Sequence, residues 1–327
     1  MIKVAFFDTK QYDIPSFEKY IKDNDIEVKF FETKLTMDTV GLAYEFDAVI
    51  VFVNDVINKE VIDKLIEYGV KIVCLRCAGF NNVDLKYAKG KLPVVRVPAY
   101  SPYAVAEHTM AMLLTSLRRI HKAYNRTREF NFSLNGFTGF DLHGKTVGVI
   151  GTGKIGKIFI NICKGFSMNV IAYDLYPDTS ADIKYVSLEE IFTNSDIISL
   201  HCPLTKDNEY LINKDSISKM KKGVFILNTS RGKLIDAEDL LVGIKERKVG
   251  AACLDVYEDE NDIFFKDYSG HIVEDDVLAR LISMPNVLIT SHQAFLTEEA
   301  LDNIASTTVD NIKSFFCENK VQNEITI

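Results

Sequence analysis

Polar residues that could do chemistry follow four apolar runs of the chain. The runs end in SLHCPLT (199–205), ILNTSRG (226–232), CLDVYEDE (253–260) and LITSHQAF (288–295), which supply an arginine, acids and a histidine. If the runs are parallel strands, their carboxyl ends meet at the sheet edge where ligands bind. Hydride transfer to a 2-oxo acid requires a cation for the carboxylate, a proton donor for the carbonyl oxygen and a group that keeps the donor protonated. The four segments together offer a candidate for each of these three groups.

A glycine-rich turn lies between an apolar run and a helical sequence. The run TVGVI leads into GTGKIG (151–156), and the next apolar run ends in Asp174, 18 residues beyond Gly156. In this context Gly151 allows a tight turn, Gly153 lets the backbone approach a pyrophosphate, and Gly156 permits close helix packing. Glycines also occur at purely structural turns, but strand, turn, helix and acid in this order predict a dinucleotide site.

Asp174 also predicts which dinucleotide binds. A carboxylate accepts hydrogen bonds from ribose hydroxyls and repels a 2′-phosphate. The next residues, Leu175 and Tyr176, bring no positive charge that could hold such a phosphate. NAD is therefore expected rather than NADP.

Composition excludes several classes of protein. The 327 residues suggest two domains, and 47% apolar with 26% charged residues is typical of a globular protein. A formal charge of −8 disfavours a nucleic-acid partner. The most apolar stretches, 97–117 and 281–297, contain prolines and polar residues, so no membrane span is expected, and the N-terminus shows no secretion signal.

The cysteines indicate a reducing compartment. Six are scattered along the chain, and the pair Cys74 and Cys77 lies in an apolar run with no second pair. We interpret both as buried apolar residues rather than metal ligands, expect no metal site, and place the protein in the cytoplasm.

Strands and helices alternate along the whole chain, which predicts an α/β fold with doubly wound parallel sheets. Apolar runs without alternation suit parallel strands covered on both faces. Two helices are expected to begin near residue 101, where Ser101 precedes Pro102, and near Thr297. The expected strands are Ile2–Phe7, Ala48–Val53, Val70–Leu75, Thr146–Ile150, Asn169–Tyr173, Asp196–Leu200, Gly223–Leu227, Gly250–Leu254 and Val287–Thr290.

Five motifs in this order, GTGKIG, HCPLT, NTSRG, DVYEDE and SHQAF, resemble the D-2-hydroxyacid dehydrogenase family. CAGFNNVD (77–84) and VPAYSP (97–102) extend the resemblance over nearly the whole chain, and within the family the chain is most similar to fermentative bacterial D-lactate dehydrogenases. The resemblance implies a Rossmann-type NAD domain (101–296) inserted into a smaller flavodoxin-like substrate domain (1–100 and 297–327). The implied reaction is reversible hydride transfer between NADH and pyruvate, giving D-lactate.

The resemblance also implies roles for individual residues. Arg231 would bind the substrate carboxylate, His292 would be the acid and base, and Glu260 would pair with His292, with Glu258 as the alternative partner. Substrate contacts would come from Phe52, Ala78, Gly79, Tyr100, Arg231 and Phe295. Cofactor contacts would come from Gly151, Gly153, Lys154, Ile155, Gly156, Asp174, Cys202, Pro203, Asn208, Thr229, Ser230 and Asp255. His201 is interpreted as structural, and His108, His121, His143 and His271 as helix-face or loop residues.

One departure from the family pattern and two alternatives bear on the function. Ser291 and Gln293-Ala294-Phe295 flank His292 where many family members have proline and Ile-Ala/Gly-Gly, and Phe295 suggests a closed pocket for a small side chain. A dehydrogenase for a bulkier 2-oxo acid remains open, as does an NADH-sensing scaffold of the corepressor type within the same family. A homodimer or homotetramer is expected, with a small-molecule substrate as the other partner.

Overall fold

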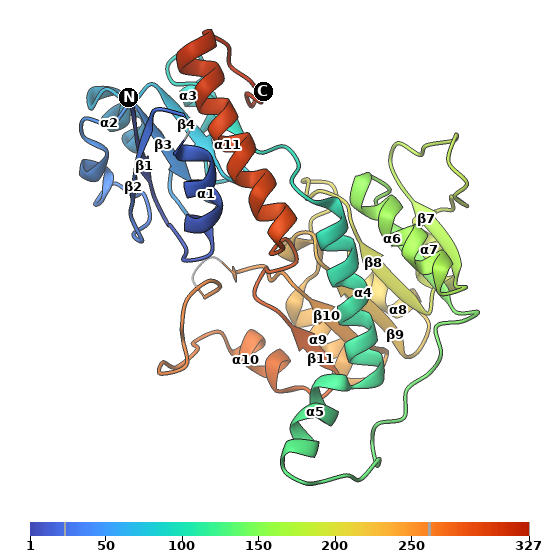
Figure 1. The fold of residues 1–327 in the computed structure, drawn as a ribbon. Helices are drawn as coiled ribbons and strands as arrows, with labels where there is room; N and C mark the ends of the chain where they lie inside the picture. Colours follow the sequence, from blue (N-terminus) through green and yellow to red (C-terminus); the bar gives the residue numbers. More distant parts are fainter. Residues whose placement is uncertain (23, 261–262, 327) are drawn as a thin grey trace. The chain divides into compact units, whose positions relative to one another are not determined.

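The computed structural model describes residues 1–22, 24–260 and 263–326. The chain divides into two compact units, each built on its own parallel sheet (Figure 1). The first unit comprises Met1–Ser101 and Leu296–Ile327, and the second comprises Pro102–Phe295. Each division lies one residue from a predicted domain boundary.

The first unit has a five-stranded sheet in the order β2-β1-β3-β4-β5, which is the flavodoxin-like order. The central strands β3 and β4 are buried at every position, as strands covered by helices on both faces must be. Its elements are β1 (Ile2–Phe6), α1 (Asp13–Ile21), β2 (Ile26–Phe30), η1 (Val40–Ala43), β3 (Ala48–Val51), α2 (Lys59–Glu67), β4 (Ile72–Leu75), α3 (Leu85–Ala88), β5 (Val94–Arg96) and α11 (Glu298–Glu318). Thr297 caps α11 as predicted, because its side chain accepts the N–H of Ala300.

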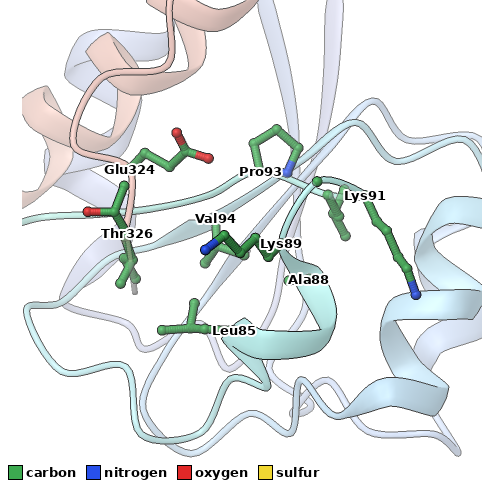
Figure 2. A pocket seen from close by; sticks show the side chains of 11 residues that line it. Leu85, Ala88, Lys89, Lys91, Pro93, Val94, Glu324 and Thr326 are labelled. Carbon is green, nitrogen blue, oxygen red and sulfur yellow. The ribbon is translucent and has the colours of Figure 1, made fainter.

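The C-terminal segment covers the edge of this sheet. Glu324 forms an antiparallel bridge with Val95, and the N–H of Ile325 donates to the carbonyl of Val94 at 2.9 Å. A cavity of about 440 Å³ lies beside this pairing, lined by residues 85, 88–94 and 324–326 (Figure 2). None of the predicted site residues lines it.

The second unit has a six-stranded parallel sheet in the order β11-β10-β9-β8-β6-β7. The isolated parallel bridge between Ala172 in β7 and Tyr185 adds a minimal further strand outside β7. When this bridge is counted as a strand beyond β7, the strand order matches the Rossmann arrangement. The chain builds the sheet outward in both directions from β6, so the strand order reverses there. Its elements are α4 (Pro102–Arg118), α5 (Ile120–Arg128), β6 (Thr146–Ile150), α6 (Lys154–Gly165), β7 (Asn169–Tyr173), α7 (Leu188–Asn194), β8 (Ile197–Leu200), α8 (Lys214–Lys219), β9 (Val224–Asn228), η2 (Gly232–Leu234), α9 (Ala237–Lys245), β10 (Val249–Leu254), α10 (Asp276–Ser283) and β11 (Val287–Ile289).

Two hydrophobic clusters bury the two faces of the second sheet. One joins α4 and α6 to residues such as Val147 and Val149 of β6, and the other joins α7–α10 to residues such as Ile198 and Leu200 of β8. Helices on both faces leave the strand ends as the accessible part of the sheet. The carboxyl ends of β6, β8, β9, β10 and β11 carry the predicted motifs, so the predicted doubly wound fold is confirmed.

Candidate active site

The glycine turn after β6 has the geometry that a pyrophosphate needs. Gly151 has a φ of +95°, a conformation that L side chains rarely adopt. A Cβ on Gly156 would lie 2.0 Å from the carbonyl oxygen of Gly151, so only glycine lets α6 pack this closely. A Cβ on Gly153 would meet nothing within 4 Å, so space is open in front of this residue.

The N-terminus of α6 opens into the same space. Gly153 is the N-cap and contributes no side-chain hydrogen bond, so the first N–H groups of the helix are left for an anion. Lys154, in the first turn of α6, is exposed, and Ile155 packs against the hydrophobic cluster that joins α4 and α6 to β6. The turn therefore fits the pyrophosphate of a dinucleotide.

Asp174 lies directly after β7, beside this turn. Its Oδ2 accepts the N–H of Thr152 at 2.6 Å and its Oδ1 accepts the N–H of Tyr176 at 2.9 Å. Burial acts to raise the pKa of Asp174, but these hydrogen bonds hold it below its ordinary value. The carboxyl group is therefore ionised at neutral pH, and its role toward a ribose stays a prediction.

Cofactor choice should follow this charge. We expect kcat/KM with NADH to exceed that with NADPH by at least about tenfold, because like-charge repulsion costs on the order of 1–2 kcal/mol. Asp174→Asn should reduce this ratio, whereas Asp182→Asn, which removes a carboxylate exposed elsewhere in the unit, should leave it unchanged. Equal efficiency with both cofactors in the wild type would contradict the assignment of Asp174.

Four of the predicted cofactor residues lie in two loops, after β8 and β9, which are hydrogen-bonded to each other. Asn208 holds the first loop by donating to the carbonyl of Pro203 at 2.8 Å and accepting the N–H of Thr205. Ser230 donates its hydroxyl to the carbonyl of Cys202 at 2.6 Å, which links the two loops. The structure thus brings Cys202, Pro203, Asn208 and Ser230 together.

Hydrogen bonds and close packing hold the loop after β9, which carries Arg231, in a single backbone conformation. Buried Asn228 accepts the N–H of Ser230 and donates to the carbonyl of Arg231, so one side chain bridges the turn. A Cβ on Gly232 would lie 2.0 Å from the backbone of Tyr257, which places this loop directly against the DVYEDE loop. The structure therefore brings the arginine loop and the acidic loop together.

His292 and Glu260 form the pair that the motifs predicted. The Nδ1 of His292 lies 2.7 Å from the Oε1 of Glu260, and the other carboxylate oxygen accepts the N–H of Tyr257 at 2.9 Å. Glu258 lies elsewhere: its Oε1 accepts the N–H of Ala237 and it hydrogen-bonds to Tyr210. Geometry therefore favours Glu260 over Glu258 as the partner of His292.

Asp255 has a structural task that its prediction as a cofactor residue did not include. Its carboxylate is buried and accepts the N–H groups of Gln293 at 2.9 Å and Ala294 at 2.8 Å, while its carbonyl accepts the N–H of His292. Asp255 thus shapes the loop that carries His292. Sequence reasoning missed this because the two segments are far apart in the chain.

Phe265 is a second residue that the motifs did not indicate. Its ring centroid lies 6.0 Å from that of His292, and its backbone is left-handed with φ +64°. The neighbouring Phe264 is buried in the core of the second unit, which anchors this part of the loop. Phe295, predicted to shape the substrate pocket, is only 7% exposed.

Four predicted substrate residues belong to the first unit. The carbonyls of Ala78 and Tyr100 accept hydrogen bonds from Arg96 and Asn303, and the carbonyl of Gly79 accepts one from the Cys77 thiol. These contacts hold the backbone of each residue. Their roles toward substrate stay predictions.

Phe52, the fourth of them, lies over a buried cluster of charges. The guanidinium of Arg76 lies 3.9 Å from the Phe52 ring centroid and forms an ion pair with Asp13 at 3.2 Å. Asp55 accepts the N–H of Phe52 at 2.5 Å and the N–H of Leu35 at 2.6 Å. Burial raises the pKa of Asp55 to about 7, although these two hydrogen bonds act against it.

Asp55 should make stability depend on pH. An acid whose folded pKa is raised contributes stability that is present below its unfolded value, near 3.8, and is lost as pH rises through about 7. The melting temperature of the wild type, relative to that of Asp55→Asn, should therefore fall between pH 5 and pH 8. Scanning fluorimetry across this range measures the difference, and a constant difference would show that Asp55 titrates at its ordinary pH.

Two negative findings apply to the described part of the chain. In it, no helix combines the length and the apolar character that crossing a membrane requires. The same residues include no cluster of three or more His, Cys, Asp or Glu side chains arranged to hold a metal ion. All six cysteines are free, and Cys74 and Cys77 are buried.

A Rossmann sheet with this turn, an acid after its second strand and a histidine–carboxylate pair is an arrangement suited to a dinucleotide-dependent dehydrogenase. Residues 110–294 match the family model of the D-isomer specific 2-hydroxyacid dehydrogenase NAD-binding domain. The chain belongs to the D-2-hydroxyacid dehydrogenase family and is an NAD-dependent dehydrogenase.

The similarity to several relatives extends over nearly the full chain. A 2-hydroxyacid dehydrogenase homolog of Haemophilus influenzae is 51% identical over 98% of this chain and 99% of its own. D-lactate dehydrogenase of Escherichia coli is 49% identical over 99% of this chain and 100% of its own. The structure of the pyruvate reductase of Chlamydomonas reinhardtii superposes with a TM-score of 0.93 at 42% identity, covering 99% and 98% of the two chains.

Proposed function

We propose that this enzyme catalyses pyruvate + NADH + H⁺ ⇌ D-lactate + NAD⁺. The observation that carries the proposal is the His292–Glu260 pair at 2.7 Å, next to the Arg231 loop and in the same unit as a turn that fits a pyrophosphate. The names of the E. coli and Chlamydomonas relatives support pyruvate and D-lactate as the substrate pair.

The pair fixes which ring nitrogen handles the proton. An ionised carboxylate only accepts hydrogen bonds, so the Nδ1 of His292 carries a proton directed at Glu260. The Nε2 atom is then the one that gives a proton to the carbonyl oxygen during reduction and takes it back during oxidation. Glu260 keeps the ring oriented and stabilises its positive charge.

Arg231 would hold the substrate by its carboxylate. A guanidinium matches a carboxylate with two parallel hydrogen bonds, which orients the whole 2-oxo acid. Bound NADH supplies the hydride that C2 receives. The roles of Ala78, Gly79, Tyr100, Phe52 and Phe295 around the substrate are part of this proposal and follow from the family resemblance.

A substrate panel with product analysis tests the proposal. NADH consumption by the purified chain is followed with pyruvate, 2-oxobutyrate, 2-oxoisocaproate and phenylpyruvate, and the product is resolved on a chiral column. We expect the highest kcat/KM with pyruvate and only the D-isomer as product. A preference for phenylpyruvate or 2-oxoisocaproate would favour the bulkier 2-oxo acid, and no turnover at all would favour the scaffold.

Removing the charge of Glu260 should move the pH profile. In Glu260→Gln the protonated form of His292 loses its stabilising neighbour, so the fall of the pyruvate-reduction rate with rising pH should begin at a lower pH. The acid-side limb of lactate oxidation, which uses neutral His292, should move in the same direction. Measuring kcat/KM against pH for wild type, Glu260→Gln and the matched Glu258→Gln shows which carboxylate acts on His292. A shift only in Glu258→Gln would transfer the role to that residue.

We further infer that copies of the chain associate through the second unit. Phe130, Phe132 and Leu134 are 83%, 70% and 81% exposed, and Tyr103 and Tyr124 are more than half exposed. Apolar surface of this extent on one unit supports a covering partner, and a homodimer or homotetramer is the simplest. Light scattering over a range of concentrations tests it. Action in the cytoplasm, supported by the free cysteines, belongs to the same proposal.

A further inference from the structure

The backbone of His292 is held in an unusual conformation. Its φ is +54°, in the left-handed region that residues other than glycine seldom occupy. The two N–H groups that follow, of Gln293 and Ala294, both donate to the carboxylate of Asp255. The turn that presents His292 therefore depends on where this carboxylate lies.

A short chain of hydrogen bonds runs from α4 to that carboxylate. The Thr290 hydroxyl lies 2.6 Å from the Oδ1 of Asp255, and the Nε2 of His108 lies 3.2 Å from the Thr290 hydroxyl and 3.5 Å from the same Oδ1. A carboxylate can only accept, so the single hydroxyl proton of Thr290 goes to Asp255. The Thr290 oxygen then accepts from His108, which requires a proton on Nε2.

Several hydrogen bonds stabilise the negative charge of the Asp255 carboxylate. The Asp255 side chain is 1% exposed, and a buried carboxylate is costly without partners. Although burial acts to raise its pKa, the hydrogen bonds from His108, Thr290 and Ala294 and the nearby charge of His292 hold it below the ordinary value. His108 and Thr290 thus supply partners to Oδ1 of Asp255, the same oxygen that accepts the N–H of Gln293.

Helix α4 is a suitable support for both functional loops. Next to His108, Thr109 donates its hydroxyl to the carbonyl of Val105, so its oxygen accepts the hydroxyl of Thr229 at 2.8 Å. The thiol of Cys253 in β10 donates to the carbonyl of Met112 on the same helix. The buried face of one helix therefore contacts β10 and the loops that carry Arg231 and His292.

We propose that His108 is a positioning residue for His292, acting through Thr290 and Asp255. It does not touch the substrate. It holds the carboxylate that fixes the left-handed turn, and so keeps the imidazole aligned with Glu260 and with the carbonyl oxygen to be protonated. The inference rests on the proposed acid–base role of His292.

Three variants test the hydrogen bonds that run from His108 through Thr290 to Asp255. His108→Leu keeps bulk and removes the N–H donor, Thr290→Val removes the hydroxyl, and His108→Gln restores an N–H at similar reach. We expect kcat for pyruvate reduction to fall about tenfold or more in His108→Leu and Thr290→Val, since small misplacements of a catalytic group are costly. NADH affinity should stay near the wild-type value. The melting temperature should fall modestly in His108→Leu and Thr290→Val, because the buried Asp255 carboxylate loses a partner, and His108→Gln should recover most of the activity.

Two comparisons make the test specific. Because both residues act in one chain, the double variant should be no slower than the slower single variant. The exposed His143, which precedes β6, provides the same His→Leu change as a control expected to have wild-type kcat.

Proton NMR of the cofactor-free protein gives a readout independent of turnover. The Nδ1 proton between His292 and Glu260 should give a low-field signal in the wild type and in His108→Gln, absent from His292→Gln. It should broaden or vanish in His108→Leu.

Failure of this inference differs from failure of the proposed function. A wild type that reduces pyruvate while His108→Leu and Thr290→Val keep full kcat and the low-field signal overturns the positioning role. A His108→Gln that is as slow as His108→Leu also overturns it, because the N–H would not matter. A wild type without turnover on any 2-oxo acid overturns the proposed function, and the NMR comparison still tests the chain.

Discussion

Replacing His292 with glutamine should lower kcat for both pyruvate reduction and D-lactate oxidation by about two to four orders of magnitude. Glutamine keeps a polar group near Glu260 but has no nitrogen that gives and takes a proton near neutral pH. The loss should appear at every pH, unlike the shifted limb expected for Glu260→Gln. Steady-state rates in both directions, from pH 5 to pH 9, measure it.

Matched measurements separate chemistry from folding in this variant. His143→Gln makes the same change at an exposed loop position and should keep wild-type kcat. NADH affinity, measured by fluorescence titration, should be unchanged, because the predicted cofactor residues lie after other strands. A loss smaller than about tenfold would show that a different group donates the proton.

Arg231→Lys should have the second largest effect, lowering kcat/KM for pyruvate roughly ten- to a hundredfold. Lysine keeps the positive charge but lacks the planar pair of donors that orients C2, so KM should rise and kcat should fall together. The loop itself should persist, because Asn228 holds it through the backbone of Ser230 and Arg231.

The control for this variant is Arg247→Lys, a conservative change at an exposed position of the second unit. It should leave all kinetic constants unchanged. If Arg231→Lys instead abolished NADH binding and left the KM for pyruvate unchanged, Arg231 would be a cofactor residue and the substrate carboxylate would need another partner.

The architecture of the second unit was largely predictable from local sequence. The bounds of β6 and β7 agree with prediction at both ends, because these β-branched runs are followed by glycines or polar residues that cannot continue a buried strand. The glycine turn was predictable for the same reason: a positive φ and a close backbone approach are properties of single residues.

Strands and helices whose own sequences lack a clear apolar pattern were not predicted. In β2, Glu27 and Lys29 alternate with apolar residues at the edge of the sheet, and β5 has only three residues. The helix predicted to begin near residue 101 ends at Arg118, because Arg119 has a left-handed φ of +51° and α5 begins after it. Helix α5 has no buried residue, so its sequence has no apolar periodicity from which the helix could be predicted.

The sequence by itself determined most of the strands, the phosphate turn and most of the residues from which the site is built. Only the tertiary structure decided which members of that set meet. Three acids crowd one short loop, and the choice of Glu260 for His292 depends on Ala237 and Tyr210 engaging Glu258. His108, Thr290 and Asp255 come from a helix and two strand ends. Side-chain directions in irregular loops are set by contacts between distant parts of the chain, and no local pattern encodes them.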